Sequence, residues 1–201
     1  MNLAVAISIY GGGPGSGCNP DAGTCGRSAG ERTYTVNDVE KLSSPDDQLL
    51  HHDWAQDGRK ILSKPGLDLN TKQRIKNAMT LAGSVSSNLN GGVGMFGIYA
   101  DRDTVLGFIK LYVDKANSEL VVADLAVHPK IIAGEIKSKG IGTALMIHAA
   151  REAAKRGLSV GLVALRRAET FYEKLGMHES VKESGAYEWT PEEAKAFAQH
   201  G

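Results

Sequence analysis

The sequence has little cysteine, no excess of either charge and no long apolar run. Its two cysteines, Cys18 and Cys25, stand among glycines without the further Cys or His residues that a zinc site needs, so we interpret them as free thiols and expect no metal. Basic and acidic side chains number 23 each, which does not favour a nucleic-acid or membrane-surface binder. No apolar run approaches the roughly 20 residues that a membrane-spanning helix needs.

The first 30 residues differ in composition from the rest of the chain. Residues 1–10 are mildly apolar but lack the basic start of a signal peptide, which favours a cytoplasmic protein. Residues 11–17 are almost all glycine, and such a run cannot bury enough surface to offset its ordering entropy. A phosphate-binding P-loop would end in Lys-Ser or Lys-Thr, which is absent here. We therefore predict a flexible Gly-rich leader over residues 1–30 and one domain over residues 31–201.

Helical patterns come first in the predicted domain. A short helix is expected within residues 35–50, with Asn37 as its N-cap and with Pro45 as an interruption. A second helix is predicted from residue 70 or 71 to about residue 86, because its apolar residues recur at helical spacing.

Three strands with short turns between them are predicted next. Their apolar residues alternate or run together over residues 96–100, 105–113 and 120–127. Consecutive strands joined by tight turns favour an antiparallel meander.

The second half of the chain alternates between helix and strand. Residues 140–156 have an apolar line at helical spacing and end at Gly157, which is typical of a helix C-terminus. A strand is expected over residues 158–165, a short helix over residues 168–175 and another strand near residues 187–189. A last helix should begin at Pro191 with Thr190 as its N-cap.

Two motifs carry a resemblance to a known family. The strand end at residues 125–129 (LAVHP) precedes a glycine loop at residues 137–143 (KSKGIGT), and a later helix contains FYEKLG at residues 171–176. On these motifs, residues 94–180 resemble the GNAT N-acetyltransferase family. The resemblance implies an α+β fold whose central, twisted, mostly antiparallel sheet is flanked by helices. It also implies acetyl-CoA as co-substrate and an amine acceptor as partner, and it is compatible with a homodimer.

The glycine loop has an anion-binding logic of its own. Glycines allow close backbone approach, and the free N–H groups at a helix start, together with the helix dipole, favour a negative charge. Glycine at a helix start also occurs merely to relieve crowding. With the family resemblance, the expected cofactor-binding residues are Leu125, Ala126, Val127, Lys137, Ser138, Lys139, Gly140, Ile141, Gly142 and Thr143.

The chain departs from the family pattern at four places. Lys137 stands where Gln or Arg is usual, so a bidentate phosphate contact is lost. Ser138 replaces a common Gly, and Leu165 replaces a frequent Asn. Residues 130–136 form a longer lead into the loop than is typical, and we expect this insertion to contact the acceptor or a partner.

Amide formation needs a base for the amine and an acid for the departing thiolate. Tyr172 is the candidate acid, and its alternative role is an aromatic anchor for its helix. Asp124 is the candidate base; otherwise it is a solvated residue or binds the acceptor amine. Glu119 and His128 are weaker candidates. The run at residues 51–53 (HHD) lacks a Ser or Cys motif to form a triad.

Two functions are compatible with these residues. The first is an enzyme that transfers an acetyl group from acetyl-CoA to an amine of an unidentified small molecule or protein. The alternative is a catalytically weak or inactive GNAT-like binding or structural module, tethered to a larger assembly by its leader. A retained acid at Tyr172 favours the enzyme.

Overall fold

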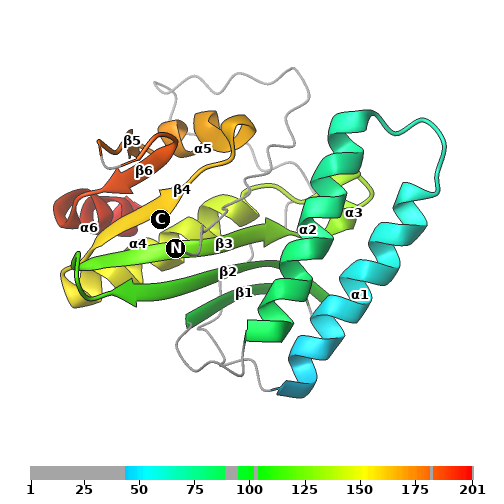
Figure 1. The fold of residues 1–201 in the computed structure, drawn as a ribbon, viewed down its shortest axis with the longest axis horizontal. Helices are drawn as coiled ribbons and strands as arrows, with labels where there is room; N and C mark the ends of the chain where they lie inside the picture. Colours follow the sequence, from blue (N-terminus) through cyan, green and yellow to red (C-terminus); the bar gives the residue numbers. More distant parts are fainter. Residues whose placement is uncertain (1–43, 89–94, 102–103, 182, 201) are drawn as a thin grey trace, which may run out of the picture.

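The structure is a computed structural model and describes residues 44–88, 95–101, 104–181 and 183–200. The predicted leader, and the N-cap at Asn37, lie outside these residues. The described part is a sheet with helices on both faces, as the family resemblance implied (Figure 1).

Two long helices form the N-terminal part of this structure. The first, α1, spans Ser44–Leu62, so the prediction that Pro45 interrupts a helix is wrong. Proline is tolerated in the first turn because the N–H it lacks would have no helical partner there. The second, α2, spans Leu69–Asn88 and confirms the predicted helix. Asp68 caps α2 by accepting hydrogen bonds from Thr71 N at 2.9 Å and Thr71 Oγ1 at 2.6 Å.

The sheet has six strands in the order β1-β2-β3-β4-β6-β5. The predicted meander is confirmed as β1 (Met95–Asp101), β2 (Thr104–Asp114) and β3 (Glu119–Val127), which pair antiparallel. β4 (Ser159–Val163) pairs parallel with β3, and β6 (Ala186–Trp189) pairs antiparallel with β4. The edge strand β5 (His178–Glu179) was not predicted, because two exposed residues carry no periodic pattern.

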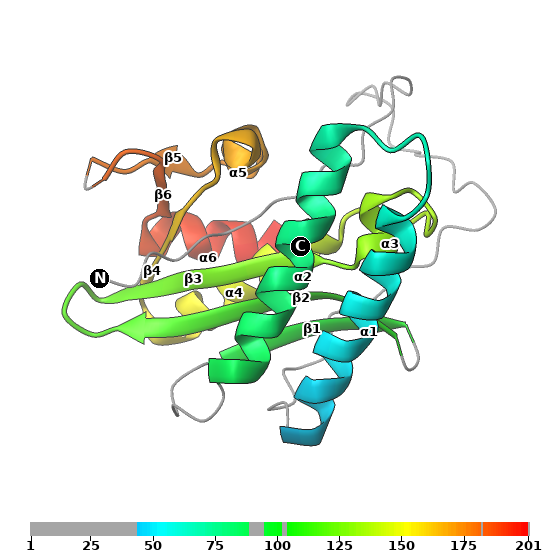
Figure 2. The same ribbon diagram turned by 45° about the vertical axis from the view of Figure 1, so that its right-hand side comes forward.

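Helices α1 and α2 cover one face of the sheet and α4 (Ile141–Arg156) covers the other (Figures 1 and 2). A Cβ on Gly107 of β2 would collide with Ile141 and Leu145, so Gly107 faces α4. Its neighbour Phe108 points to the opposite face, where its ring centroid lies 5.3 Å from that of Trp54 on α1. These contacts fix which β2 and β3 side chains lie under α1 and α2.

The remaining helices agree closely with the sequence pattern. Gly157 ends α4 with a φ of 65°, as predicted for a C-terminal glycine. The predicted helix at 168–175 divides into a 3₁₀ helix, η2 (Arg166–Ala168), and α5 (Glu169–Lys174). The last helix, α6 (Pro191–His200), begins as predicted: Thr190 Oγ1 accepts from Glu193 N at 3.2 Å, and Glu193 Oε2 accepts from Thr190 N at 2.8 Å.

Candidate active site

Strands β3 and β4 pair over a short length and then diverge. Their parallel register covers three residue pairs, the last being Val121 with Gly161, while β3 continues to Val127 (Figure 1). Beyond Val121, the β3 edge on the β4 side has no partner strand among the described residues. Leu125, Ala126 and Val127, the predicted cofactor-binding residues of this strand, lie on that stretch.

The first turn of α4 lies at the end of β3. Ile141 contacts Gly107, and Gly107 is paired with Val127 at the strand's end. Gly140, the N-cap, has a φ of 82° and forms no side-chain capping bond. The opening N–H groups of α4 therefore lack both an intrahelical partner and a side-chain cap, which is the arrangement that binds anions.

The loop before α4 presents two lysines and one buried hydroxyl. Lys137 and Lys139 are exposed and Ser138 is half-buried. Ser138 Oγ itself is buried and has no hydrogen-bond partner in the part of the chain that the structure describes. A buried hydroxyl without a partner is costly, so its place in this loop is consistent with a ligand that hydrogen-bonds to it.

Gly140 and Gly142 differ in what surrounds them. A Cβ on Gly140 would meet nothing within 4 Å, so the backbone there is open to a ligand. A Cβ on Gly142 would meet the ring of Phe171 at 3.2 Å. The missing side chain at Gly142 therefore admits Phe171, a role that the sequence pattern did not predict. Thr143, next in the turn, is half-buried.

Tyr172 on α5 is fully buried. Its ring centroid lies 5.1 Å from that of Phe171 on the same helix and 6.2 Å from that of Tyr187 on β6, a packing that is compatible with the alternative role of an anchor for α5. Its hydroxyl oxygen is buried and has no hydrogen-bond partner within the described residues. Burial raises the pKa of this phenol far above its ordinary value, so the hydroxyl keeps its proton at neutral pH.

Asp124 lies beside a bulge in β3. The register pairs Asp124 with Lys110 but Val122 with Leu111, which leaves Ala123 as the extra residue. Asp124 Oδ2 lies 4.0 Å from Lys110 Nζ, and its side chain is 13% exposed. Burial raises the pKa of Asp124, and the charge of Lys110 partly opposes this. Because Lys110 shares the face of Phe108, Asp124 lies under α1 and α2.

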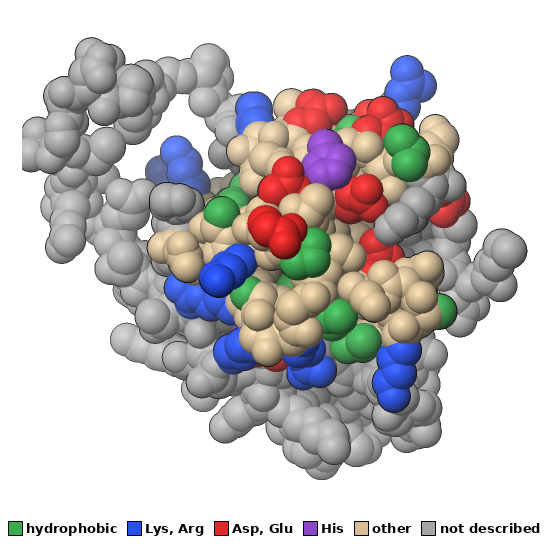
Figure 3. Space-filling view, turned by 90° about the vertical axis from the view of Figure 1, so that its left-hand side faces the viewer, with side chains coloured by type: hydrophobic (Ala, Val, Ile, Leu, Met, Phe, Trp, Pro, Cys, Tyr) green, Lys and Arg blue, Asp and Glu red, His purple; other side chains and the backbone are tan. Residues whose placement is uncertain are grey.

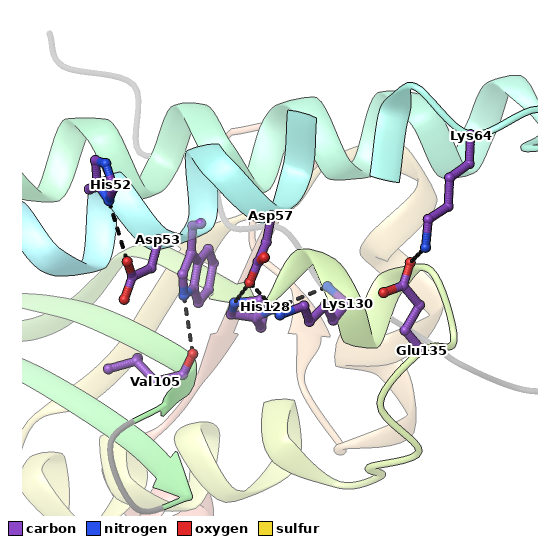
Figure 4. Close-up of polar contacts among 9 residues, drawn as sticks. His52, Asp53, Asp57, Lys64, Val105, His128, Lys130 and Glu135 are labelled. Carbon is purple, nitrogen blue, oxygen red and sulfur yellow. Dashed lines mark hydrogen bonds and ion pairs between the residues drawn. The ribbon is translucent and has the colours of Figure 1, made fainter. Parts of the chain in front are cut away.

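His128 is buried at the junction of β3 with α3 (Pro129–Ile132), as Figure 4 shows. Its Nδ1 accepts a hydrogen bond from Lys130 N at 3.1 Å and so caps α3. Its Nε2 lies 3.5 Å from Asp57 Oδ2, and its ring packs edge-on against Trp54. Burial lowers the pKa of His128 to about 4. With both ring nitrogens engaged, His128 is not placed to act as a base.

The insertion at 130–136 is bound to α1 and the turn after it by two ion pairs. Lys130 Nζ lies 2.6 Å from Asp57 Oδ2, and Lys64 Nζ lies 2.8 Å from Glu135 Oε1 (Figure 4). No sequence pattern predicts these contacts, because the partners are far apart in the chain, by 71 positions for Lys64 and Glu135, and none belongs to a motif.

Two further groups of titratable side chains include none of the predicted site residues. His52 and Asp53 are both exposed and 3.4 Å apart, and no cluster that could hold a metal occurs among the described residues. Acidic side chains gather on the face that carries β5, β6 and α6 (Figure 3), where His178 lies 3.7 Å from Glu188 and 3.5 Å from Glu193. This acidic face would repel an anionic ligand.

The open strand edge, the uncapped helix start and the glycine loop all fall within one sequence segment. Residues 92–178 match the family model described as the acetyltransferase (GNAT) domain. This segment of the chain is therefore similar to GNAT acetyltransferase domains. This confirms the family resemblance of the two motifs, and the α1–α2 pair precedes the matched GNAT segment.

Solved structures similar to this chain share little sequence with it. The PaiA N-acetyltransferase from Thermoplasma acidophilum in complex with coenzyme A is 20% identical with a TM-score of 0.46, over 75% of this chain and 95% of that one. A GCN5-related N-acetyltransferase from Rhodopseudomonas palustris is 17% identical with a TM-score of 0.47, over 79% and 96%. The structure of the AtaT–AtaR complex bound to DNA is 21% identical with a TM-score of 0.49, over 59% of this chain and 81% of that one.

No curated protein matches the sequence. Among the described residues, no helix combines the length and the apolar character needed to cross a membrane.

Proposed function

We propose that this GNAT domain transfers an acetyl group from acetyl-CoA to the amine of an acceptor. The observation that carries the proposal is the divergence of β3 and β4 after Val121, with the uncapped start of α4 at the end of β3. An extended thioester ligand can hydrogen-bond to a free strand edge, and its phosphates can bind at a helix N-terminus.

The residues present fit such a ligand. The β3 backbone at Leu125–Val127 would hold the pantetheine arm, and the N–H groups from Gly140 to Thr143 would hold the phosphates. Lys137 and Lys139 add positive charge without the planar fork of an arginine. The partnerless Ser138 Oγ supports the assignment, because a bound ligand would satisfy it. When bound, acetyl-CoA supplies the thioester whose acetyl group is transferred.

Two side chains would move the protons of this reaction. Asp124, whose pKa burial raises, would accept the proton that the acceptor amine loses as it attacks the thioester carbon. Tyr172, whose hydroxyl has no hydrogen-bond partner among the described residues, would donate its proton to the sulfur as the carbon–sulfur bond breaks. The products are then the acetylated amine and the free thiol, with Asp124 protonated and Tyr172 restored by proton exchange with solvent.

In the alternative, an inactive binding module, Tyr172 would need only its ring. A ring that only anchors α5 has no need of a hydroxyl, and burying that hydroxyl without a partner costs about 1–3 kcal/mol. Phenylalanine would anchor the helix without this cost. The retained hydroxyl therefore favours the enzyme.

The test combines cofactor binding with turnover. Isothermal calorimetry with acetyl-CoA should give a one-to-one complex, and an amine screen read by thiol release should find an acceptor. Gly140→Asp, which places a negative charge at the start of α4, should abolish binding, whereas the matched change Gly134→Asp in the insertion should not. Absence of binding at millimolar acetyl-CoA would contradict the proposal; binding without turnover on any amine would favour the inactive module.

A further inference from the structure

Two arginines from distant parts of the chain meet beside the diverging strands. Arg74 lies on α2 and Arg167 lies in η2, directly after β4. In the amide orientation that satisfies its hydrogen bonds, Asn77 Oδ1 accepts from Arg167 Nη2, which holds Arg167 against α2 one turn from Arg74. The Nη2 of Arg74 is buried and has no hydrogen-bond partner among the described residues.

The charges of the two arginines repel each other. Neither guanidinium forms an ion pair with a carboxylate in the part of the chain that the structure describes. Burial, and next the charge of Arg167, lower the pKa of Arg74, while Asp68 acts in the opposite direction. Both carboxylate oxygens of Asp68 already accept hydrogen bonds from Thr71. The pair therefore holds excess positive charge and one buried donor without an acceptor.

The position of the pair relates it to the proposed acetyl transfer. Helix α2 packs on β3, and η2 continues from β4, so the two arginines come from elements on either side of the divergence. Asp124 lies under α1 and α2, on the same face of the sheet as α2. An acceptor that uses both features would lie on this face, with its amine toward Asp124 and another of its groups toward the arginines.

We propose that Arg74 and Arg167 form a binding site for a carboxylate or phosphate group carried by the acceptor. The inference rests on the proposed acetyl transfer and names its substrate class: amines that bear an anionic group. A carboxylate or phosphate fits because its oxygens accept paired N–H donors from guanidinium groups, which are planar and fork-shaped. It would also provide the missing acceptor for Arg74 Nη2 and offset the repulsion between the two charges.

The same chemistry occurs on the phosphates of acetyl-CoA, so the two sources must be separated. We assign the site to the acceptor, because the start of α4 and its two lysines already provide a place for the phosphates of acetyl-CoA. Arg74→Gln and Arg167→Gln each remove one guanidinium group and keep a polar side chain. Arg166→Gln is the matched control, because it changes a neighbouring residue for which no contact with Asn77 is seen.

The first experiment measures the site directly with inorganic phosphate. Millimolar phosphate should raise the melting temperature of the wild type above its value in chloride of equal ionic strength. The rise should be smaller in Arg74→Gln and Arg167→Gln, where only the start of α4 can still bind phosphate, and should keep its wild-type size in Arg166→Gln; Arg74→Lys should lose less of it than Arg74→Gln. A wild type that phosphate does not stabilise, or a rise that both substitutions leave intact, would overturn the anion site.

The second experiment compares matched acceptors by thiol release. Thiol release should be faster with β-alanine than with β-alaninamide, and faster with phosphoethanolamine than with ethanolamine. Arg74→Gln should raise the KM for the anionic amine of each pair roughly tenfold to hundredfold. The KM for the neutral amine and the Kd of acetyl-CoA should stay unchanged. A loss in acetyl-CoA affinity instead would assign the arginines to the cofactor and refute the acceptor assignment. Phosphate stabilisation without thiol release from any amine would refute acetyl transfer and leave the anion site standing.

Discussion

Gly142 in the first turn of α4 lies directly against the ring of Phe171 in α5. A Cβ on residue 142 would come within 3.2 Å of Phe171 Cζ and 3.6 Å of its Cε2. Phe171 directly precedes Tyr172, whose ring it contacts. The turn proposed to bind phosphates is therefore packed against the helix that carries the proposed acid.

Gly142→Val should reduce both stability and cofactor affinity, because its methyl groups would push Phe171 away from α4. Overpacking of this kind costs about 1–3 kcal/mol in the free energy of unfolding, measured by urea denaturation. Phe171→Leu, which frees space, should restore much of the loss in the double variant. Additive effects of the two changes would mean that the contact is not the cause.

Tyr172→Phe should stabilise the folded protein and slow its acetyl transfer. Removal of a buried hydroxyl that has no partner among the described residues should raise the free energy of unfolding by about 1 kcal/mol. The same change removes the proposed proton donor, so kcat should fall while the Kd of acetyl-CoA stays constant. Stopped-flow thiol release and calorimetry separate the two effects. An unchanged kcat would leave Tyr172 as an anchor only.

The acid limb of the rate profile should depend on Asp124. Because burial raises the pKa of Asp124, kcat/KM should decline, as the pH falls, at a pH above the ordinary range for an aspartate. Lys110 lowers the pKa of Asp124, so Lys110→Gln should move this limb to higher pH. Asp124→Asn should remove most of the activity at every pH. A limb that Lys110→Gln does not move would exclude Asp124 as the titrating base.

His128 should make the stability of the protein sensitive to mild acid. Its pKa in the folded state is about 4, below the unfolded value of 6.5, so the folded state binds this proton less readily. Stability from this group is complete above pH 6.5 and is lost as the pH falls toward 4, by about 3 kcal/mol in total.

His128→Asn provides the measurement for that prediction. Asparagine keeps an acceptor for the α3 N-cap but does not titrate. Urea unfolding of both proteins from about pH 7.5 to about pH 4.5 should show that the free energy of unfolding falls more steeply for the wild type than for His128→Asn. Parallel curves would show that His128 is not the group responsible.

Local patterns predicted most of the secondary structure and the cofactor loop. Residues Ile141, Leu145, Ala149 and Ala153 are spaced for one helix face, and all four are buried in α4. Alternation and turns likewise predicted the meander. Pro45 misled the prediction because its effect depends on whether a helix begins or is already under way, which a single residue does not tell.

The acceptor side of the site could not be predicted in this way. Arg74 and Arg167 lie 93 positions apart (167 − 74), and only the packing of α2 beside η2 brings them together. Asp57 and His128 are likewise distant in sequence and meet through the contact of α1 with α3. The face on which Asp124 lies depends on the β2–β3 register and its bulge at Ala123, which alternation alone does not specify.

The ion pairs between α1 and the insertion restrict how the acceptor side can open. If α1 swings away from the sheet, Asp57 must either release Lys130 and His128 or draw α3 along with it. Because α3 leads directly into the loop before α4, the second course would also displace the turn proposed for the phosphates. The helix over the acceptor face and the cofactor loop are thus connected through Asp57, and a hinge between them would have to break its ion pair with Lys130.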